Sequence, residues 1–187
     1  MFPAIDAATG TLPVGRFPAT LAQVKATYVD APEFAGSSTR SEIWDDFDDA
    51  TRVLRDIVPV AYVWIAGSFT TDKLDPDDLD VIYWCEDRLV DLVTDVRDKQ
   101  ILELFAKNQV RHTTGYRLDT RYGRWHVHPE ADRMPKAEHM SYAAIRGYWD
   151  DFWLRSRSGA KTDPLVRDDA LPRRGYLEVM LDGVYVV

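Results

Sequence analysis

The sequence predicts an α/β or α+β fold whose mixed β-sheet is flanked by helices. Segments with helical spacing of apolar residues alternate along the chain with short apolar runs rich in β-branched and aromatic residues. The 187 residues are 45% hydrophobic and include six tryptophans. That composition is typical of a packed core, so we expect a single domain over residues 1–187.

The N-terminal part combines an irregular segment with a long helix. Residues 1–37 are rich in Pro, Gly, Ala and Thr, and we expect an extended N-terminal arm with a short helix over 21–26. A helix is predicted over 40–57, because its apolar residues recur at helical spacing behind a Ser-Ser-Thr start.

The central part predicts two buried strands and a second long helix. Residues 60–67 and 79–85 are continuous apolar runs with β-branched and aromatic side chains, and the first run ends in glycine. A helix should follow over 88–107. The two strands therefore frame the polar segment between them.

The C-terminal third adds further strands and one helix. Two short strands are predicted within 115–129, on either side of a Tyr-Gly pair, and a helix over 141–156. The last thirteen residues, 175–187, alternate around an Asp-Gly pair, which predicts a C-terminal β-hairpin.

Charge is unevenly distributed over the chain. The formal net charge is −8, and residues 1–110 hold 10 Lys/Arg against 20 Asp/Glu. Residues 111–174 hold 13 against 9 and are locally basic. A polyphosphate partner would therefore need this basic segment or bound cations, although an ordinary acidic surface accounts equally well for the net charge.

Several classes of protein are disfavoured by simple counts. A single cysteine excludes an intrachain disulfide framework and a cysteine-rich zinc site. The N-terminus lacks the basic start and long apolar block of a signal peptide, and no apolar run reaches the roughly 18 residues that span a bilayer. We expect a cytoplasmic protein with no membrane partner.

The run WIAGSFTTDKLDPDDLDVIYW places five aspartates between the two central strands. Asp78 and Asp80 flank one leucine at the start of a strand, so their side chains should share a face. Two adjacent carboxylates repel each other, and Mg²⁺ relieves that repulsion while keeping room for water and phosphates. The remaining three aspartates are typical of a solvated loop. A helix-loop-helix calcium site is disfavoured, because the central glycine and terminal glutamate are missing.

The other end of the same run is suited to phosphate. Gly67 and Ser68 end the first strand, where a glycine lets backbone N–H groups come close to a phosphate. The nine residues between Ser68 and Asp78 allow a short helical turn, from which Lys73 would reach phosphate oxygens. The run as a whole therefore suits a phosphate ligand bound together with Mg²⁺.

The order of these features resembles the signature of the DNA polymerase beta-like nucleotidyltransferase superfamily: a strand, Gly-Ser, a short spacer, and Asp-apolar-Asp at the start of the next strand. The matching residues are Gly67, Ser68, Asp78 and Asp80. The longer string GSFTTDKLDPDDLDVIYW is similar to small uncharacterised prokaryotic and phage nucleotidyltransferase-like proteins, as are the segments LPVG and RRGYLEVML near the two ends. The resemblance implies a nucleotidyltransferase fold, a triphosphate held by Gly-Ser, and metal ions held by the two aspartates.

The resemblance also implies a third carboxylate from a neighbouring strand. Asp119, in the first strand after the second long helix, is the favoured candidate for this catalytic and metal-binding role. Glu178 is the alternative, since an acid among apolar strand residues needs an explanation. Asp119 could instead open a turn and Glu178 could face water, in which case two-metal catalysis becomes doubtful.

These features lead to one leading hypothesis and two alternatives. The leading one is a Mg²⁺-dependent nucleotidyltransferase that moves a nucleoside monophosphate from an NTP to an RNA, protein or small-molecule hydroxyl. The first alternative is a catalytically silent fold of this type that acts as a binding protein, such as an antitoxin, immunity or phage-defence component. The second is an RNA-binding module that uses the basic segment.

Three further groups have a structural interpretation beside a functional one. His126 and His128 share a strand face, which suits a transition metal, but no cysteine or well-placed carboxylate completes the site. The aromatic residues of 148–153 favour core packing over base stacking. Arg40 stands at a helix start near the arm, and the spacing does not decide whether it lies close to the site. Four other arginines could form a basic rim for phosphate or RNA, or a solvated face: Arg155, Arg157, Arg173 and Arg174.

Overall fold

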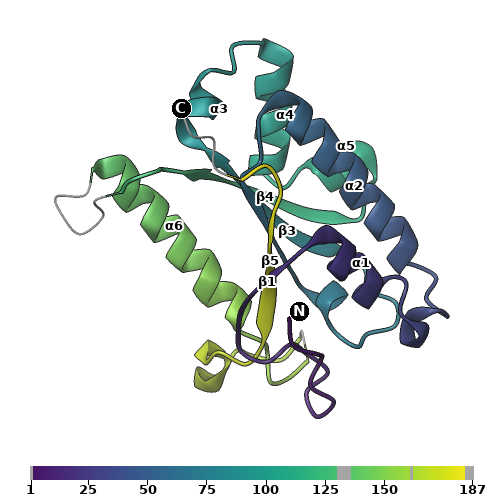
Figure 1. Cartoon of the computed structure of the whole chain (residues 1–187). Coiled ribbons are helices and arrows are strands. Elements are labelled where there is room, and N and C mark those ends of the chain that lie inside the picture. The colour runs from purple at the N-terminus through teal and green to yellow at the C-terminus, as the bar shows by residue number, and fades with distance from the viewer. Residues whose placement is uncertain (1, 130–135, 161, 184–187) are drawn as a thin grey trace.

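The computed structural model describes residues 2–129, 136–160 and 162–183, and it contains a five-stranded mixed sheet with helices on both faces (Figure 1). The strand order is β1-β5-β2-β3-β4. β1 is parallel to β5 and β4 is parallel to β3, whereas β2 is antiparallel to both of its neighbours. This confirms the predicted mixed sheet. The strands are β1 Gly15–Ala19, β2 Tyr62–Ala66, β3 Leu79–Glu86, β4 Leu118–Trp125 and β5 Gly175–Met180.

Helix α6 lies along one face of the sheet, whereas α1, α2, α4 and α5 lie on the other face (Figure 1). The α-helices are α1 Leu21–Tyr28, α2 Arg40–Ile57, α3 Asp87–Asp91, α4 Val96–Ala106, α5 Val110–Thr114 and α6 Ala137–Leu154. Three short 3₁₀ helices join them: η1 Pro32–Phe34, η2 Ser68–Thr70 and η3 Arg167–Ala170. None of the described helices has the length and apolar character to cross a membrane.

The alternation of side chains along each strand divides the core into two parts. Val63 and Ile65 of β2 pack in the larger core beneath α2, with Tyr83 of β3. The residue between them, Trp64, points to the opposite face and packs with Trp84 and with Trp153 of α6. The central strands are therefore apolar on both faces, as their continuous apolar sequences predicted.

Several predicted elements are confirmed with small shifts at their ends. α2 has the predicted bounds, 40–57, and its buried residues lie on the predicted apolar side. β2 and β3 lie within or close to the predicted runs, and α1 covers the predicted short helix. α6 begins four residues before the predicted 141–156 and ends two residues earlier.

The predicted helix over 88–107 is wrong as one element, because it is interrupted. α3 ends at Asp91, and α4 begins at Val96. The side chain of Asp95 accepts hydrogen bonds from the backbone N–H groups of Arg97 and Asp98, so this residue caps a new helix. Apolar periodicity alone did not show this restart.

The two short strands predicted within 115–129 are wrong as well, because the structure has the single strand β4 there. Gly123 lies within β4 rather than in a turn. A Cβ atom at this position would be 2.5 Å from ring atoms of Trp84 on the neighbouring strand. The glycine therefore makes room for the indole and does not end the strand.

The N-terminal segment contributes more structure than an extended arm with one helix. Residues 15–19 form edge strand β1, which pairs with β5 over five residues. Pro18 is tolerated there because an edge strand needs hydrogen bonds on one side only. β5 itself, the first strand of the predicted hairpin, is paired on both sides, and the second run of that hairpin, 184–187, lies outside the described residues.

Candidate functional site

The Gly-Ser and Asp-apolar-Asp segments meet at one end of the antiparallel pair β2–β3. Ala66, the last residue of β2, is paired with Asp80 near the start of β3. Gly67 follows with a positive φ of 81°, and Ser68 begins the short helix η2. The predicted strand, glycine and helical turn are therefore confirmed as local structure.

Gly67 is required by a contact that the sequence did not indicate. A Cβ atom at this position would lie 1.7 Å from Oδ2 of Asp80. The backbone at Gly67 thus packs directly against the carboxylate group. Glycine is needed here for the positive φ and for this close approach.

Asp80 lies beside two other carboxylates. In the parallel pair β3–β4 it is the partner of Asp119, and strands in a sheet lie about 4.8 Å apart. The pKa of Asp80 is raised to about 6, first by burial and then by the negative charges of Asp119 and Asp78. The structure therefore brings the three favoured acids, Asp78, Asp80 and Asp119, to the same end of the sheet.

Two of these three acids are paired with arginines. Nη1 of Arg111 donates to Oδ2 of Asp78 at 2.7 Å, and Nη1 of Arg121 donates to Oδ1 of Asp119 at 2.6 Å. Across the part of the chain that the structure describes, no three His, Cys, Asp or Glu side chains form a group able to hold a metal ion. The acids are adjacent, but their side chains do not converge on one point.

Glu178 is not brought to this group. It lies on β5, and it is paired with Trp64 of β2, so one strand separates it from β3. Oε2 of Glu178 accepts a hydrogen bond from the Trp64 indole at 2.7 Å and lies 3.6 Å from Nε of Arg16. The carboxylate that looked unusual among apolar residues is balanced by these contacts.

Lys73 and Ser68 lie in the loop between the strands. Nζ of Lys73 donates to Oδ2 of Asp77 at 2.9 Å, and both side chains are largely exposed. Ser68 is partly exposed at the start of η2. In this structure, therefore, Lys73 pairs with an acid of its own loop.

The loop is held in shape by a buried arginine, Arg40. Its side chain is 1% exposed and packs over the ring of Phe34, with the guanidinium carbon 3.8 Å from the ring centroid. The guanidinium donates to five backbone carbonyl oxygens, four of them in the loop: those of Tyr28, Phe69, Thr71, Lys73 and Leu74. Burial lowers the pKa of Arg40 to about 10, so the group remains charged at neutral pH.

The same loop is attached to the start of α2 and to the start of β4. Oδ1 of Asp75 accepts hydrogen bonds from the backbone N–H of Ser38 at 2.7 Å and from the hydroxyl of Ser37 at 3.1 Å. Arg117 donates to the carbonyl oxygens of Asp77 and Pro76. Asp75, which suited a solvated loop by sequence, therefore has a defined structural role.

Three arginines near the acids were not recognised as a group from the sequence. Arg111 and Arg121 pair with acids, and the positive charge of Arg174 acts on Asp80. Arg121 had a usable signal, because it stands two residues after Asp119 and so shares its strand face, and Arg174 was expected only as part of a basic rim for phosphate or RNA. Arg111 and Arg174 come from distant segments, so only the tertiary structure shows their position.

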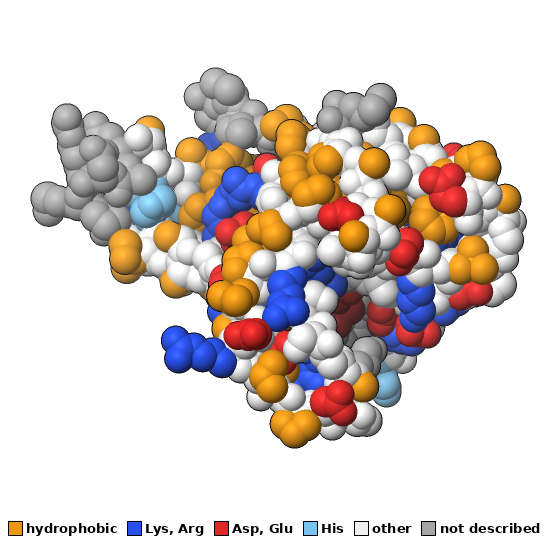
Figure 2. Space-filling view, turned by 90° about the horizontal axis from the view of Figure 1, so that it is seen from below, with side chains coloured by type: hydrophobic (Ala, Val, Ile, Leu, Met, Phe, Trp, Pro, Cys, Tyr) orange, Lys and Arg blue, Asp and Glu red, His pale blue; other side chains and the backbone are white. Residues whose placement is uncertain are grey.

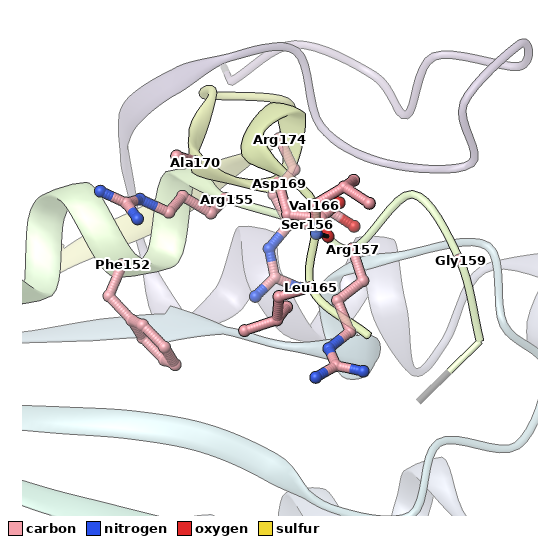
Figure 3. A pocket seen from close by; sticks show the side chains of 10 residues that line it. All are labelled: Phe152, Arg155, Ser156, Arg157, Gly159, Leu165, Val166, Asp169, Ala170 and Arg174. Carbon is pink, nitrogen blue, oxygen red and sulfur yellow. Dashed lines mark hydrogen bonds between the residues drawn. The ribbon is translucent and has the colours of Figure 1, made fainter. Parts of the chain in front are cut away.

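A cavity of about 840 Å³ adjoins the acid group through Arg174, which lines it. Its walls come from the end of α6, the segment that follows, and η3 (Figure 3). Figure 2, which shows the molecule from below, has a hollow with acidic side chains inside it and basic side chains beside it. This end of the molecule therefore combines the acids, the Gly-Ser turn and an arginine-lined cavity.

The histidines form a separate cluster beyond the C-terminal end of β4, whereas Asp119 lies near the start of that strand. The rings of His126, His128 and His139 lie with centroids 4.9–6.4 Å apart. Nδ1 of His126 is 2.5 Å from Oδ2 of Asp87. The sequence showed no carboxylate near these residues, and the fold supplies one from α3.

Comparison with known proteins places the chain in a family without assigning an activity. The chain belongs to the family of unknown function DUF6932, which matches residues 3–180. No curated protein and no solved structure shows significant similarity to it. The function must therefore be argued from the site.

Proposed function

We propose that this protein is a Mg²⁺-dependent nucleotidyltransferase that moves a nucleoside monophosphate from an NTP to an acceptor hydroxyl. One observation carries the proposal: Asp80 lies beside Asp119 across neighbouring strands, directly against the backbone of the Gly67–Ser68 turn. An acid group for a cation and a glycine turn for phosphate are thus adjacent, as the resemblance to the superfamily implies. The proposal therefore includes both the nucleotidyltransferase fold and the transfer of a nucleoside monophosphate.

The carboxylates suit Mg²⁺ in their chemistry. They are hard oxygen donors, and the pKa of Asp80 is raised first by burial and then by repulsion from Asp119 and Asp78, which a cation would relieve. Asp78, Asp80 and Asp119 are the residues that would hold it, after Asp78 and Asp119 exchange their arginine partners for the ion. When bound, Mg²⁺ would neutralise phosphate charge and make the acceptor hydroxyl more acidic.

The other residues of the site would bind and orient the triphosphate. The Ser68 hydroxyl and the backbone N–H groups that follow Gly67 are donors suited to its distal phosphates. The acceptor oxygen would form a bond to the α-phosphorus while the bond from that phosphorus to the bridging oxygen breaks. Pyrophosphate leaves, and the hydroxyl proton passes to solvent.

The test is transfer of label from each α-labelled NTP, with Mg²⁺ and with cell RNA, protein and small-molecule extract as acceptors. The wild type should label one of these fractions, and Asp80→Asn should lower transfer by at least about 100-fold, because the acid nearest the turn loses its charge. Asp77→Asn is the matched control, since Asp77 is an exposed acid of the same loop that pairs with Lys73. Equal transfer by wild type and Asp80→Asn would refute the assignment.

One observation favours the second candidate, a catalytically silent binding protein of the antitoxin, immunity or phage-defence type. Arg111 and Arg121 neutralise two of the acids internally, as a site without a metal would require. Titration with Mn²⁺, followed by electron paramagnetic resonance, separates the two candidates. Binding that is lost in Asp80→Asn supports the enzyme, whereas no binding at millimolar Mn²⁺ supports the silent protein.

A further inference from the structure

The cavity next to the acid group has a charge opposite to that of the whole molecule. The net charge of the chain is −8, yet three arginines and one aspartate line this cavity: Arg155, Arg157, Arg174 and Asp169. The aspartate is already engaged, because it accepts hydrogen bonds from the backbone N–H groups of Ser158 and Val166. Arg155 is paired with Asp151 of α6, so Arg157 and Arg174 set the sign of the potential in the cavity.

Arg174 presents unused donors to this space. Among the described residues its side chain makes one hydrogen bond, from Nε to the carbonyl oxygen of Trp153 at 3.1 Å. Its two terminal nitrogens retain their donors, and Figure 3 shows the guanidinium directed into the cavity beside Leu165. Nε of Arg155, on the same cavity, is buried without a hydrogen-bond partner. The unused donors of Arg174 and the buried Nε of Arg155 favour an anionic ligand.

The lining also contains three large apolar side chains that are exposed. Phe152, Leu165 and Val166 have exposed fractions of 50%, 67% and 54%, although each is a residue that proteins usually bury. They come from α6 and from the segment before η3, so they are brought together only by the fold. An apolar surface of this kind inside a cavity marks a ligand site rather than scattered surface residues.

We propose that this cavity holds the acceptor, and that the acceptor is a small hydroxyl-bearing organic anion with an apolar body. The volume of about 840 Å³ lies within the usual range for small-molecule sites, about 300–1,000 Å³. Of the three acceptors considered, RNA, protein and small molecule, a cavity of this size favours the small molecule. The anionic group, phosphate or carboxylate, binds Arg174, and the apolar body packs on Phe152 and Leu165. The assignment of the ligand as acceptor rests on the proposed function. Arg174 links the two sites, because it lines the cavity and its positive charge acts on Asp80.

Isothermal titration calorimetry with four probes tests the binding chemistry: phenyl phosphate, benzoate, inorganic phosphate and phenol. Phenyl phosphate or benzoate should bind at least about tenfold more tightly than phosphate or phenol, because only they engage both the arginines and the apolar wall. The tighter of the two aromatic anions identifies the charged group. Inorganic phosphate binding as tightly as phenyl phosphate, or no binding of either aromatic anion, would overturn the proposal.

Two variants locate the binding in this cavity. Arg174→Gln should weaken binding of the aromatic anion at least about tenfold, whereas Arg173→Gln, a neighbouring arginine outside the lining, should leave it unchanged. Leu165→Glu adds a negative charge to the cavity at an exposed position that folding does not need, and it should weaken binding similarly. Unchanged binding in both Arg174→Gln and Leu165→Glu would place the ligand elsewhere.

Failure of this proposal and failure of the proposed function give different results. Binding of the aromatic anion without any nucleotide transfer contradicts the enzyme assignment and leaves the cavity assignment standing. Transfer to an RNA or protein acceptor that is unaffected by Leu165→Glu contradicts the cavity assignment alone.

Discussion

Arg40 is buried and Asp80 is partly buried, and the charges of these two side chains are compensated in opposite ways. Arg40 is surrounded by carbonyl oxygens that complement its charge, and it makes five hydrogen bonds to them. Asp80 is surrounded by other carboxylates and by the Gly67 backbone, so its charge is poorly compensated. Arg40 is therefore a stabilising residue, whereas Asp80 lowers the stability of the fold when it is ionised, which is typical of a functional group.

Replacing Arg40 with Ala should lower the free energy of unfolding by about 3 kcal/mol or more, because five carbonyl groups lose their donor. Urea unfolding followed by circular dichroism measures this. Arg52→Ala is the control, since Arg52 forms only an exposed pair with Asp49, and a change within about 0.5 kcal/mol is expected. Similar losses in the two variants would mean that Arg40 does not organise the loop.

The raised pKa of Asp80 predicts a pH dependence of stability. The group titrates near 3.8 when unfolded and at about 6 when folded, so the folded state binds the proton more tightly. Stability should therefore fall as pH rises from about 4 to about 6 and remain lower above that range. The shift of about two units limits the effect to about 3 kcal/mol.

Urea unfolding of wild type and Asp80→Asn at pH 4 and pH 8 tests this dependence. The variant should be more stable than wild type at pH 8 and nearly equal to it at pH 4. Saturating Mg²⁺ at pH 8 should stabilise wild type and leave Asp80→Asn unchanged. A variant that is less stable than wild type at pH 8 would show that the Asp80 charge is well compensated.

At the scale of elements, the contact between β3 and β4 depends on one residue without a side chain. Trp84 of β3 lies across Gly123 of β4, and it also packs against Trp64 and Tyr142. The same pair of strands carries Asp80 and Asp119 four residues earlier. The packing of Trp84 therefore helps to fix the register that brings the two acids together.

Gly123→Ala should destabilise the protein by about 1–3 kcal/mol, because its Cβ would be 2.5 Å from the Trp84 ring. Tryptophan fluorescence during urea unfolding measures the loss and reports on the indole directly. Gly36→Ala is the matched control, since no atom lies within 4 Å of its added Cβ. Equal stability of Gly123→Ala and wild type would show that the indole moves aside freely.

At the scale of the whole molecule, the N-terminal segment completes the sheet. β1 pairs with β5 over residues 15–19, and Leu12 is buried in the larger core. Phe2 stacks on Tyr28 of α1 with ring centroids 6.1 Å apart. The residues that the sequence predicted as an extended arm therefore cover the outer edge of β5.

Deleting residues 1–19, with a new initiator methionine before Thr20, should prevent cooperative unfolding, because it exposes β5 and removes buried Leu12. Near-ultraviolet circular dichroism and urea unfolding measure the loss. Val14→Ala, an exposed change within the same segment, should unfold like wild type. Cooperative unfolding of the truncated chain at the wild-type urea midpoint would show that β1 is dispensable.

The elements that the sequence predicted correctly are those whose signal is local. α2 has a strong helical period, β2 and β3 are continuous apolar runs, and the Gly-Ser turn follows from its residues. The predictions failed at β1, at the break between α3 and α4, and at Gly123, where a sheet edge, a helix cap and a distant indole decided the structure. Each of these features depends on a specific contact that the periodicity of apolar residues does not reveal.

For the candidate site, the sequence by itself indicated which residues to consider: Gly67, Ser68, Asp78 and Asp80, with Asp119 as the favoured third acid. The spacing places Asp78 and Asp80 on one face, because i and i+2 on a strand share a face, whereas the third acid was expected from the resemblance to the superfamily. Only the tertiary structure decided that Asp119 is the strand neighbour of Asp80 while Glu178 lies beyond β2. It also decided the arginine partners of the acids and the cavity at Arg174, because these contacts join segments far apart in the chain.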